Sequence, residues 1–212
     1  MPLGRAALAM LLGLLLPPAS LADVFPREDI ITAPTWQRFS VCYDHGCSSL
    51  AVVALSEAQW EELRVLLLPL SASAAEERRR IAAGIALMEQ YVGDAIGTSR
   101  DKGGTFNFGQ EGQMDCIDES VNTTLYLTLF VRYGLMTHHQ VANRATRGWF
   151  LFGWPHTTAV IRETAGKSLW AVDSWFLDNG EPPAILPLKR WKSGWKPGEC
   201  MDCAQDASAP VH

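Results

Sequence analysis

The stretch GQMDCIDES, residues 112–120, decides how this chain folds, because a glycine-rich loop gives way there to a long amphipathic pattern. The apolar positions of that pattern recur every fourth residue: Ile117, Val121, Leu125, Leu129 and Tyr133. This spacing predicts a largely buried helix that begins at or near Cys116 and ends at Gly134. Free amides at a helix start and the helix dipole favour negative charge, so we expect the pKa of the Cys116 thiol to be lowered.

Two further residues complete a pattern that is typical of thiol enzymes. His156 follows Cys116 by forty residues, and Asp173 follows His156 by seventeen. Residues 157–163 and 168–175 are predicted strands, joined as a hairpin through residues 164–167. The hairpin would place Asp173 beside His156, where the carboxylate fixes the imidazole tautomer and the imidazole acts as base and acid for the thiol.

Other residues compete for these roles or would complete them. Gln110, six residues before Cys116, is a candidate oxyanion donor together with the Cys116 backbone N–H. Rival bases are His45, His138 and His139. Asp173 is the hardest to explain structurally, because a carboxylate in an apolar strand needs a buried partner. His156 is the obvious partner.

The remaining elements are predicted from caps and periodicity. Residues 40–43 and 49–55 are expected to be strands, and a helix starts at Ser56 with Gln59 completing a capping box. Ser73 and Glu76 repeat that signature for a helix to about residue 96. Residues 97–112 form a long loop, residues 148–152 another strand and residues 178–180 a turn, and the chain after Pro182-Pro183 is expected to be irregular.

Five cysteines leave one without a partner if the others pair locally. Cys42 with Cys47, and Cys200 with Cys203, are close enough in sequence for two local disulfides, which would leave Cys116 as the free thiol. We favour disulfides because the chain is predicted to be exported. The alternative is a zinc site made by these four outer cysteines.

Composition and the N-terminus indicate an exported single domain. Residues 1–22 have the charged, apolar and small-residue regions of a cleaved signal peptide, with an uncleaved anchor as the alternative. Residues 23–203 are then one catalytic domain, and residues 204–212 a disordered tail. The location is expected to be periplasmic or secreted, with no membrane span after signal cleavage. The net charge of −5 and the absence of a basic stretch beyond Arg78-Arg79-Arg80, which lies in a helical pattern, argue against nucleic-acid binding.

The motifs Asp-Cys-x-Asp at a helix start, Pro-His-x-x-x-Val and Val-Asp-Ser-Trp resemble those of the bacterial transglutaminase-like cysteine peptidases, within the papain-like fold superfamily. The resemblance covers roughly residues 75–178. It implies Cys116 as nucleophile, His156 as base and acid, and Asp173 as the orienting residue. Some exported members bind calcium through acidic residues near the nucleophile. Asp115 and Asp118 match such positions, but Ile117 stands where a carboxylate would help, which argues against calcium.

These observations together predict an α+β domain, papain-like or transglutaminase-like, with helices packed against a small antiparallel sheet and the nucleophile at the N-terminus of a buried helix. We expect a thiol-dependent amide-bond enzyme, a cysteine peptidase or transamidase, that needs no cofactor and acts on a protein or peptide of the cell envelope. Two alternatives are a non-catalytic envelope binding or assembly module on the same fold, and a structural zinc or redox protein built on the outer cysteines.

Overall fold

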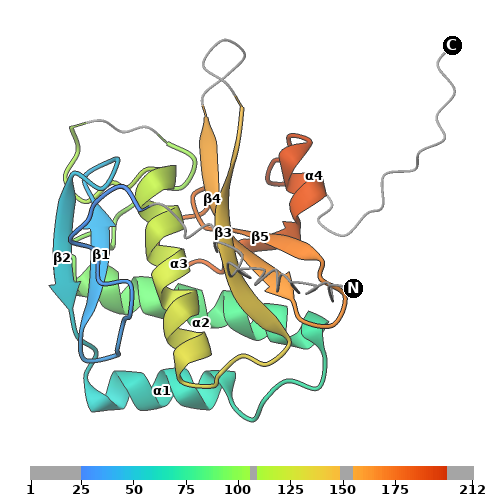
Figure 1. The fold of residues 1–212 in the computed structure, drawn as a ribbon. Coiled ribbons are helices and arrows are strands. Elements are labelled where there is room, and N and C mark those ends of the chain that lie inside the picture. Colours follow the sequence, from blue (N-terminus) through green and yellow to red (C-terminus); the bar gives the residue numbers. More distant parts are fainter. Residues whose placement is uncertain (1–24, 106–108, 149–154, 200–212) are drawn as a thin grey trace, which may run out of the picture.

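The computed structural model describes residues 25–105, 109–148 and 155–199. Within these ranges the chain forms four helices, a two-stranded antiparallel sheet and a four-stranded antiparallel sheet (Figure 1). The predicted α+β class is therefore confirmed. The predicted signal peptide, the C-terminal tail, and Cys200 and Cys203 lie outside the described residues.

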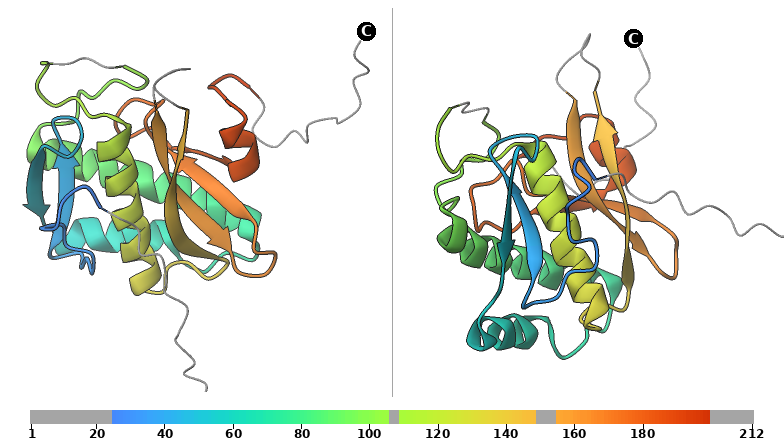
Figure 2. Two further views of the ribbon diagram at one scale, coloured as in Figure 1. Left: turned by 45° about the horizontal axis from the view of Figure 1, so that its top comes forward. Right: turned by 60° about the vertical axis from the view of Figure 1, so that its left-hand side comes forward.

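The helix α3 (Cys116–Arg132) is the centre of the fold. The two sheets lie on opposite sides of it, and α2 passes behind it (Figure 2). Its start is capped by Asp115, whose side chain accepts hydrogen bonds from the Ile117 and Asp118 amides and forms a capping box with Asp118. The helix begins at the predicted Cys116 and ends within two residues of the predicted Gly134. Tyr133 is its C-terminal capping residue, and Gly134 follows in the left-handed conformation.

The first sheet is a hairpin of β1 (Phe39–Tyr43) and β2 (Ser49–Val53). Cys42 and Cys47 form a disulfide at its turn, as predicted. With both thiols in the disulfide, Cys42 and Cys47 are not available as zinc ligands in this structure. Among the described residues, Cys116 is the free cysteine and is buried.

Two helices cover the side of α3 that the sheets leave open. In α1 (Glu57–Leu67), Ser56 and Gln59 form the predicted capping box. In α2 (Ala74–Ile96), Ser73 accepts a hydrogen bond from the Glu76 amide, and Gly97 ends the helix with φ of 84°. Apolar side chains of α1, α2 and α3 meet the inner faces of both sheets in one large core, for example through Leu63, Ile85 and Phe130.

The second sheet has the strand order β3-β4-β5-β6, with all neighbours antiparallel. The strands are β3 (His139–Arg147), β4 (His156–Glu163), β5 (Leu169–Asp173) and β6 (Ala184–Pro187). The hairpin of β4 and β5 was predicted. The edge strands β3 and β6 were not.

Both omissions have a physical reason. The sequence of β3, HQVANRATR, is mostly polar because this edge strand exposes much of its length to solvent. The expectation of irregular chain after Pro182-Pro183 is wrong, because β6 comes directly after it and places Pro187 at its end, where an edge strand tolerates it. The short helix α4 (Leu188–Lys192) comes next. Of the strand predicted at 148–152, Gly148 lies outside any strand and the rest is not described.

Among the described residues, none of the helices combines the length and the apolar character that crossing a bilayer requires.

Candidate active site

The pairing of β4 with β5 brings His156 and Asp173 together. His156 begins β4 and Asp173 ends the antiparallel neighbour β5. The Nε2 atom of His156 lies 2.7 Å from Oδ2 of Asp173. Both residues are buried, with 8% and 1% of their surface exposed. The carboxylate can therefore hold the imidazole in the tautomer that carries a proton on Nε2.

A third residue, Trp191 of α4, also contacts this pair. Its indole Nε1 donates a 2.6 Å hydrogen bond to the same Oδ2 atom of Asp173. Its ring centroid lies 5.4 Å from that of His156. The sequence patterns did not single out Trp191, because the contact depends on how α4 folds back across the sheet; a buried carboxylate's need for a second donor was the only available signal.

Arg147 holds α4 in place beside the His156–Asp173 pair. Its guanidinium lies 4.5 Å from the centroid of the Trp191 ring, and it donates hydrogen bonds to the backbone oxygens of Trp191 and Trp195. The Cα atom of Arg147 is paired with that of His156 in the sheet register. The edge strand β3 therefore carries the cation that stabilises the position of α4.

The imidazole of His156 is enclosed by aromatic rings. The centroids of Trp175 and Phe176 lie 4.8 Å and 4.9 Å from its own. Its Nδ1 atom is buried and has no hydrogen-bond partner among the described residues. With Nε2 committed to Asp173, Nδ1 is the nitrogen that can exchange a proton with another group.

Cys116 lies against the backbone on both sides of His156. Its Sγ atom lies 3.9 Å from the backbone oxygen of Pro155, and the N–H of Thr157 donates a hydrogen bond to it. The structure thus brings together the three residues that the motifs predicted, from the start of α3, the start of β4 and the end of β5. Within the described part of the chain, no hydrogen bond joins Sγ to the buried Nδ1 of His156.

The protonation of Cys116 differs from expectation. The pKa of this thiol is raised to about 11, mainly by burial and in addition by the negative charges of Asp115 and Asp173. The amides of Thr157 and of Cys116 itself act in the opposite direction, but they are outweighed. The prediction of a lowered pKa is therefore wrong for this state, because the residue is only 6% exposed and two carboxylates lie near it.

The glycine-rich loop holds two glutamines with different surroundings. Gln110 is exposed, and the described residues show no hydrogen bond from it to Cys116. Gln113 is buried, donates to the backbone oxygen of Arg100, and accepts from the amide of Lys102. Gln113 thus ties the loop together just ahead of the nucleophile, and the oxyanion role of Gln110 stays a prediction.

The two acidic residues beside Cys116 bind backbone amides. Asp115 accepts a hydrogen bond from the Gly46 N–H at 2.9 Å, and Asp118 accepts from His45 at 2.8 Å and from Cys47 at 2.6 Å. Burial and the charge of Asp115 together raise the pKa of Asp118 to about 7, even though the amides of Cys47 and His45 act to lower it. Among the described residues, no group of three or more His, Cys, Asp or Glu side chains is placed to hold a metal ion.

Three buried carboxylates from different elements lie close enough for their charges to interact: Glu89 of α2, Asp101 of the loop and Glu119 of α3. Burial raises the pKa of Glu89 to about 7 and that of Asp101 to about 6. The pKa of Glu119 is raised well above its usual range by burial and by the neighbouring negative charges. Nothing in the sequence pattern predicted this cluster, because its members are far apart along the chain.

Two of the three rival histidines, His138 and His139, have structural partners elsewhere, whereas His45 lies in the loop beside the start of α3, where its backbone N–H donates to Asp118. His139 is paired with Glu163 at the opposite end of the β3–β4 ladder from His156, and its Nδ1 lies 2.9 Å from Oε1 of Glu77. The ring of His138 lies 2.9 Å from the backbone oxygen of Ser71. Neither histidine can serve Cys116, since both belong to the far end of the sheet.

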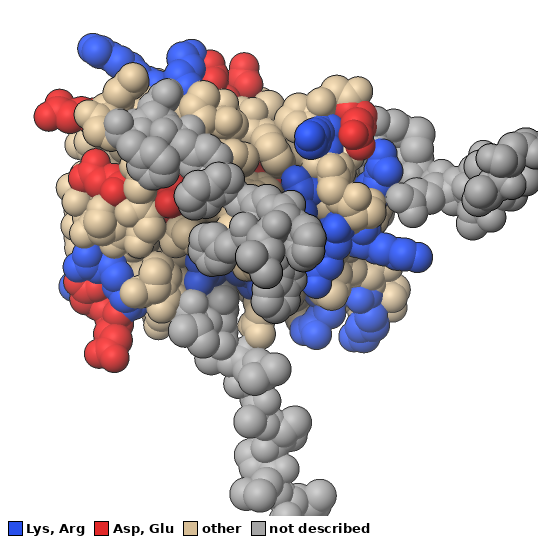
Figure 3. Space-filling model, turned by 90° about the horizontal axis from the view of Figure 1, so that it is seen from above, with Lys and Arg blue, Asp and Glu red and all other residues tan. Residues whose placement is uncertain are grey.

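The face that contains the start of α3 is shown from above in Figure 3. Lys and Arg side chains predominate on the side of α4, whereas Asp and Glu are more frequent on the opposite side. The helix α4 itself contributes Lys189, Arg190 and Lys192, of which Arg190 is paired with Glu199. The candidate site therefore has one basic flank.

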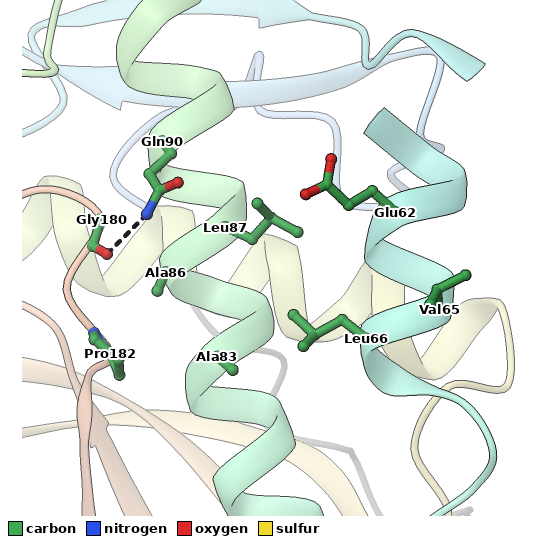
Figure 4. A pocket seen from close by; sticks show the side chains of 9 residues that line it. All are labelled: Glu62, Val65, Leu66, Ala83, Ala86, Leu87, Gln90, Gly180 and Pro182. Atoms are coloured by element: carbon green, nitrogen blue, oxygen red, sulfur yellow. Dashed lines mark hydrogen bonds between the residues drawn. The ribbon is translucent and has the colours of Figure 1, made fainter. Parts of the chain in front are cut away.

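A separate groove of about 490 Å³ lies between α1, α2 and residues 180–182 (Figure 4). Apolar side chains line most of it, including the exposed Val65 and Leu66, and Gln90 bridges to the backbone oxygen of Gly180. Cys116, His156 and Asp173 are not among its lining residues, so this groove is not part of the candidate active site.

Comparison with protein-family models, with curated proteins and with solved structures found no match for this chain.

Proposed function

We propose that this protein is an exported thiol-dependent amide-bond enzyme, similar to transglutaminase-like cysteine peptidases, that acts on a protein or peptide of the cell envelope. The single observation that carries the proposal is the buried His156–Asp173 pair, supported by Trp191, directly beside a free cysteine at a helix start. A buried, hydrogen-bonded imidazole next to a thiol is the arrangement that nucleophilic catalysis requires.

The reaction begins with the thiol of Cys116 and the carbonyl carbon of an amide. His156 takes the thiol proton on Nδ1 while Sγ bonds to the carbon, and the carbonyl oxygen becomes an oxyanion. The backbone N–H of Cys116 at the open end of α3 is a donor for that oxyanion. His156 then returns the proton to the departing amine, which leaves a thioester on Cys116.

The second half of the reaction releases the acyl group. Water (in a peptidase) or an amine (in a transamidase) gives a proton to Nδ1 of His156 as it attacks the thioester carbon. The C–S bond breaks and the proton returns to Sγ. The Asp173 carboxylate keeps its hydrogen bond to Nε2 of His156 and stabilises the imidazolium that forms in each half.

The raised thiol pKa bears on how the nucleophile is made. With a pKa of about 11, only about one thiol in ten thousand is ionised near neutral pH. The proposal is therefore general-base removal of the proton by His156 during attack, instead of a stored thiolate–imidazolium pair. The basic flank of α4 attracts substrates that carry acidic groups on that side of the scissile bond.

The second candidate function is a non-catalytic envelope binding module on the same fold. The buried, protonated state of Cys116 is the observation in its favour, since a buried free cysteine can serve as a small apolar side chain.

A peptide library prepared from whole-proteome digests separates the two. Wild-type protein should generate new peptide N-termini if it hydrolyses, or peptide–amine conjugates if it transfers, both detected by mass spectrometry. The Cys116→Ser variant, with equal melting temperature, should generate neither, because the alcohol is a poorer nucleophile at this site. Equal product from both proteins, or none from the wild type, contradicts the proposal.

A further inference from the structure

The loop closed by the Cys42–Cys47 disulfide has four successive residues in the left-handed backbone conformation. The φ angles are 65° at Asp44, 65° at His45, 65° at Gly46 and 58° at Cys47. Three of the four carry a Cβ, for which this conformation is unfavourable. Something must hold them there. Consecutive amides in such a turn point to one side and create a concave site for anions.

The anions that occupy this concave site belong to the start of α3. The amides of His45 and Cys47 donate to the two oxygens of Asp118, and the amide of Gly46 donates to Asp115. These two carboxylates are also the members of the capping box of α3. Three charge-assisted hydrogen bonds therefore join the loop to the residues on either side of Cys116.

A second contact continues the attachment by one helical turn. The side-chain oxygen of Asn122 accepts from the Cys42 amide at 2.7 Å, and its Nδ2 donates to the Cys42 oxygen at 2.9 Å. The disulfide is buried against Val121 and Leu125 of the same helix. The loop thus contacts the first three turns of α3 through both polar and apolar groups.

These contacts act on Cys116 in two ways. The capping residues Asp115 and Asp118 fix where the helix begins, so the loop that holds them also fixes the Cys116 backbone and its burial. The Gly46 amide also partly neutralises the Asp115 carboxylate, whose charge raises the pKa of the Cys116 thiol. Burial is the larger of the two influences on that thiol, so loss of the loop should matter mainly through hydration of the sulfur.

We propose that residues 42–47 form an amide cradle that positions the nucleophile, and that the Cys42–Cys47 disulfide keeps the cradle in its binding conformation. That Cys116 is a nucleophile rests on the proposed function, but the contacts of the cradle with the start of α3 are tested without a substrate. One consequence is that the active site is assembled only once the disulfide has formed, so that assembly is coupled to an oxidising environment.

The test is the pH profile of Cys116 alkylation by iodoacetamide, followed by peptide mass mapping, for wild type and Cys42→Ser/Cys47→Ser. We expect the midpoint of the variant to lie about one pH unit or more below that of wild type, with alkylation at mildly alkaline pH about tenfold faster, because water reaches the freed helix start. Product formation from the peptide library should fall about tenfold at the same time.

Two further variants separate the effect of the cradle from a general loss of stability. Asp118→Asn retains the disulfide but replaces one carboxylate oxygen, which accepts a hydrogen bond from a backbone amide, by an NH2 group, which can only donate. The midpoint of Cys116 alkylation should therefore also move to lower pH, by a smaller amount. Leu67→Ala lowers stability in a different apolar cluster and should keep the wild-type midpoint.

An unchanged or higher midpoint in both cradle variants, or an equal shift in Leu67→Ala, overturns the inference. Absence of product in wild type bears only on the proposed function, because the alkylation profile is read independently of catalysis.

Discussion

The buried carboxylate of Glu89 predicts an unusual dependence of stability on pH. One of its oxygens accepts from the Gly180 amide at 3.1 Å, and the other, Oε1, has no hydrogen-bond partner among the described residues. Burial raises its pKa from 4.5 to about 7, so the folded state holds this proton more tightly than the unfolded state does. As pH rises from about 4.5 to 7, the unfolded chain ionises first and the free energy of unfolding falls.

The size of the effect is set by the shift. A rise from 4.5 to about 7, at about 1.4 kcal/mol per unit, gives a loss of at most about 3 to 4 kcal/mol across that pH range from this one group. The variant Glu89→Gln carries no charge at any pH, and its amide can donate toward the neighbouring carboxylates of Asp101 and Glu119. We therefore expect Glu89→Gln to be more stable than wild type above about pH 7, with the advantage shrinking as pH falls toward 4.5.

Urea unfolding followed by tryptophan fluorescence, at several pH values between about 4.5 and 8, measures both curves. Glu28→Gln, at an exposed position, is the matched control and should run parallel to wild type. The reasoning is refuted if Glu89→Gln is less stable than wild type throughout, or if the difference between the two proteins does not grow with pH.

The site and its flanks lead to three other predictions. Trp191→Phe keeps an aromatic but smaller side chain and removes the donor to Asp173, and product formation should fall about ten- to a hundredfold, as expected for one buried hydrogen bond to a charged group, with little change in KM. Alkylation of the denatured, unreduced protein should add one group, at Cys116, if Cys200 and Cys203 are paired; three groups would exclude that pair. Calcium and a chelator should leave the melting temperature unchanged, because the two carboxylates at the start of α3 bind amides; stabilisation by calcium would contradict the amide cradle.

The parts of the fold that could be predicted are those with local signals. Caps at Ser56, Ser73 and Asp115 are set by residues three positions apart, so the sequence alone locates three helix starts. The hairpin that carries His156 and Asp173 also lies within twenty residues. Most of the candidate site therefore lay within reach of pattern and spacing.

The features that could not be predicted depend on contacts between distant segments. The strand β3 is polar because it lies at an edge, and Trp191 reaches Asp173 only after β6 and α4 have folded back. Free amides at the helix start predict a lowered thiol pKa, whereas burial and the charges of Asp115 and Asp173 raise it. These quantities exist only in the folded chain.

The central claim is that Cys116, His156 and Asp173 act as one catalytic unit, and a double-mutant cycle on product formation tests it most directly. If they do, His156→Ala alone should cost as much activity as His156→Ala/Asp173→Asn, because the carboxylate acts only through the imidazole. Asp173→Asn alone should also lose most activity while the protein stays folded. Independent, additive losses from the two substitutions, or full activity in His156→Ala, would contradict the account.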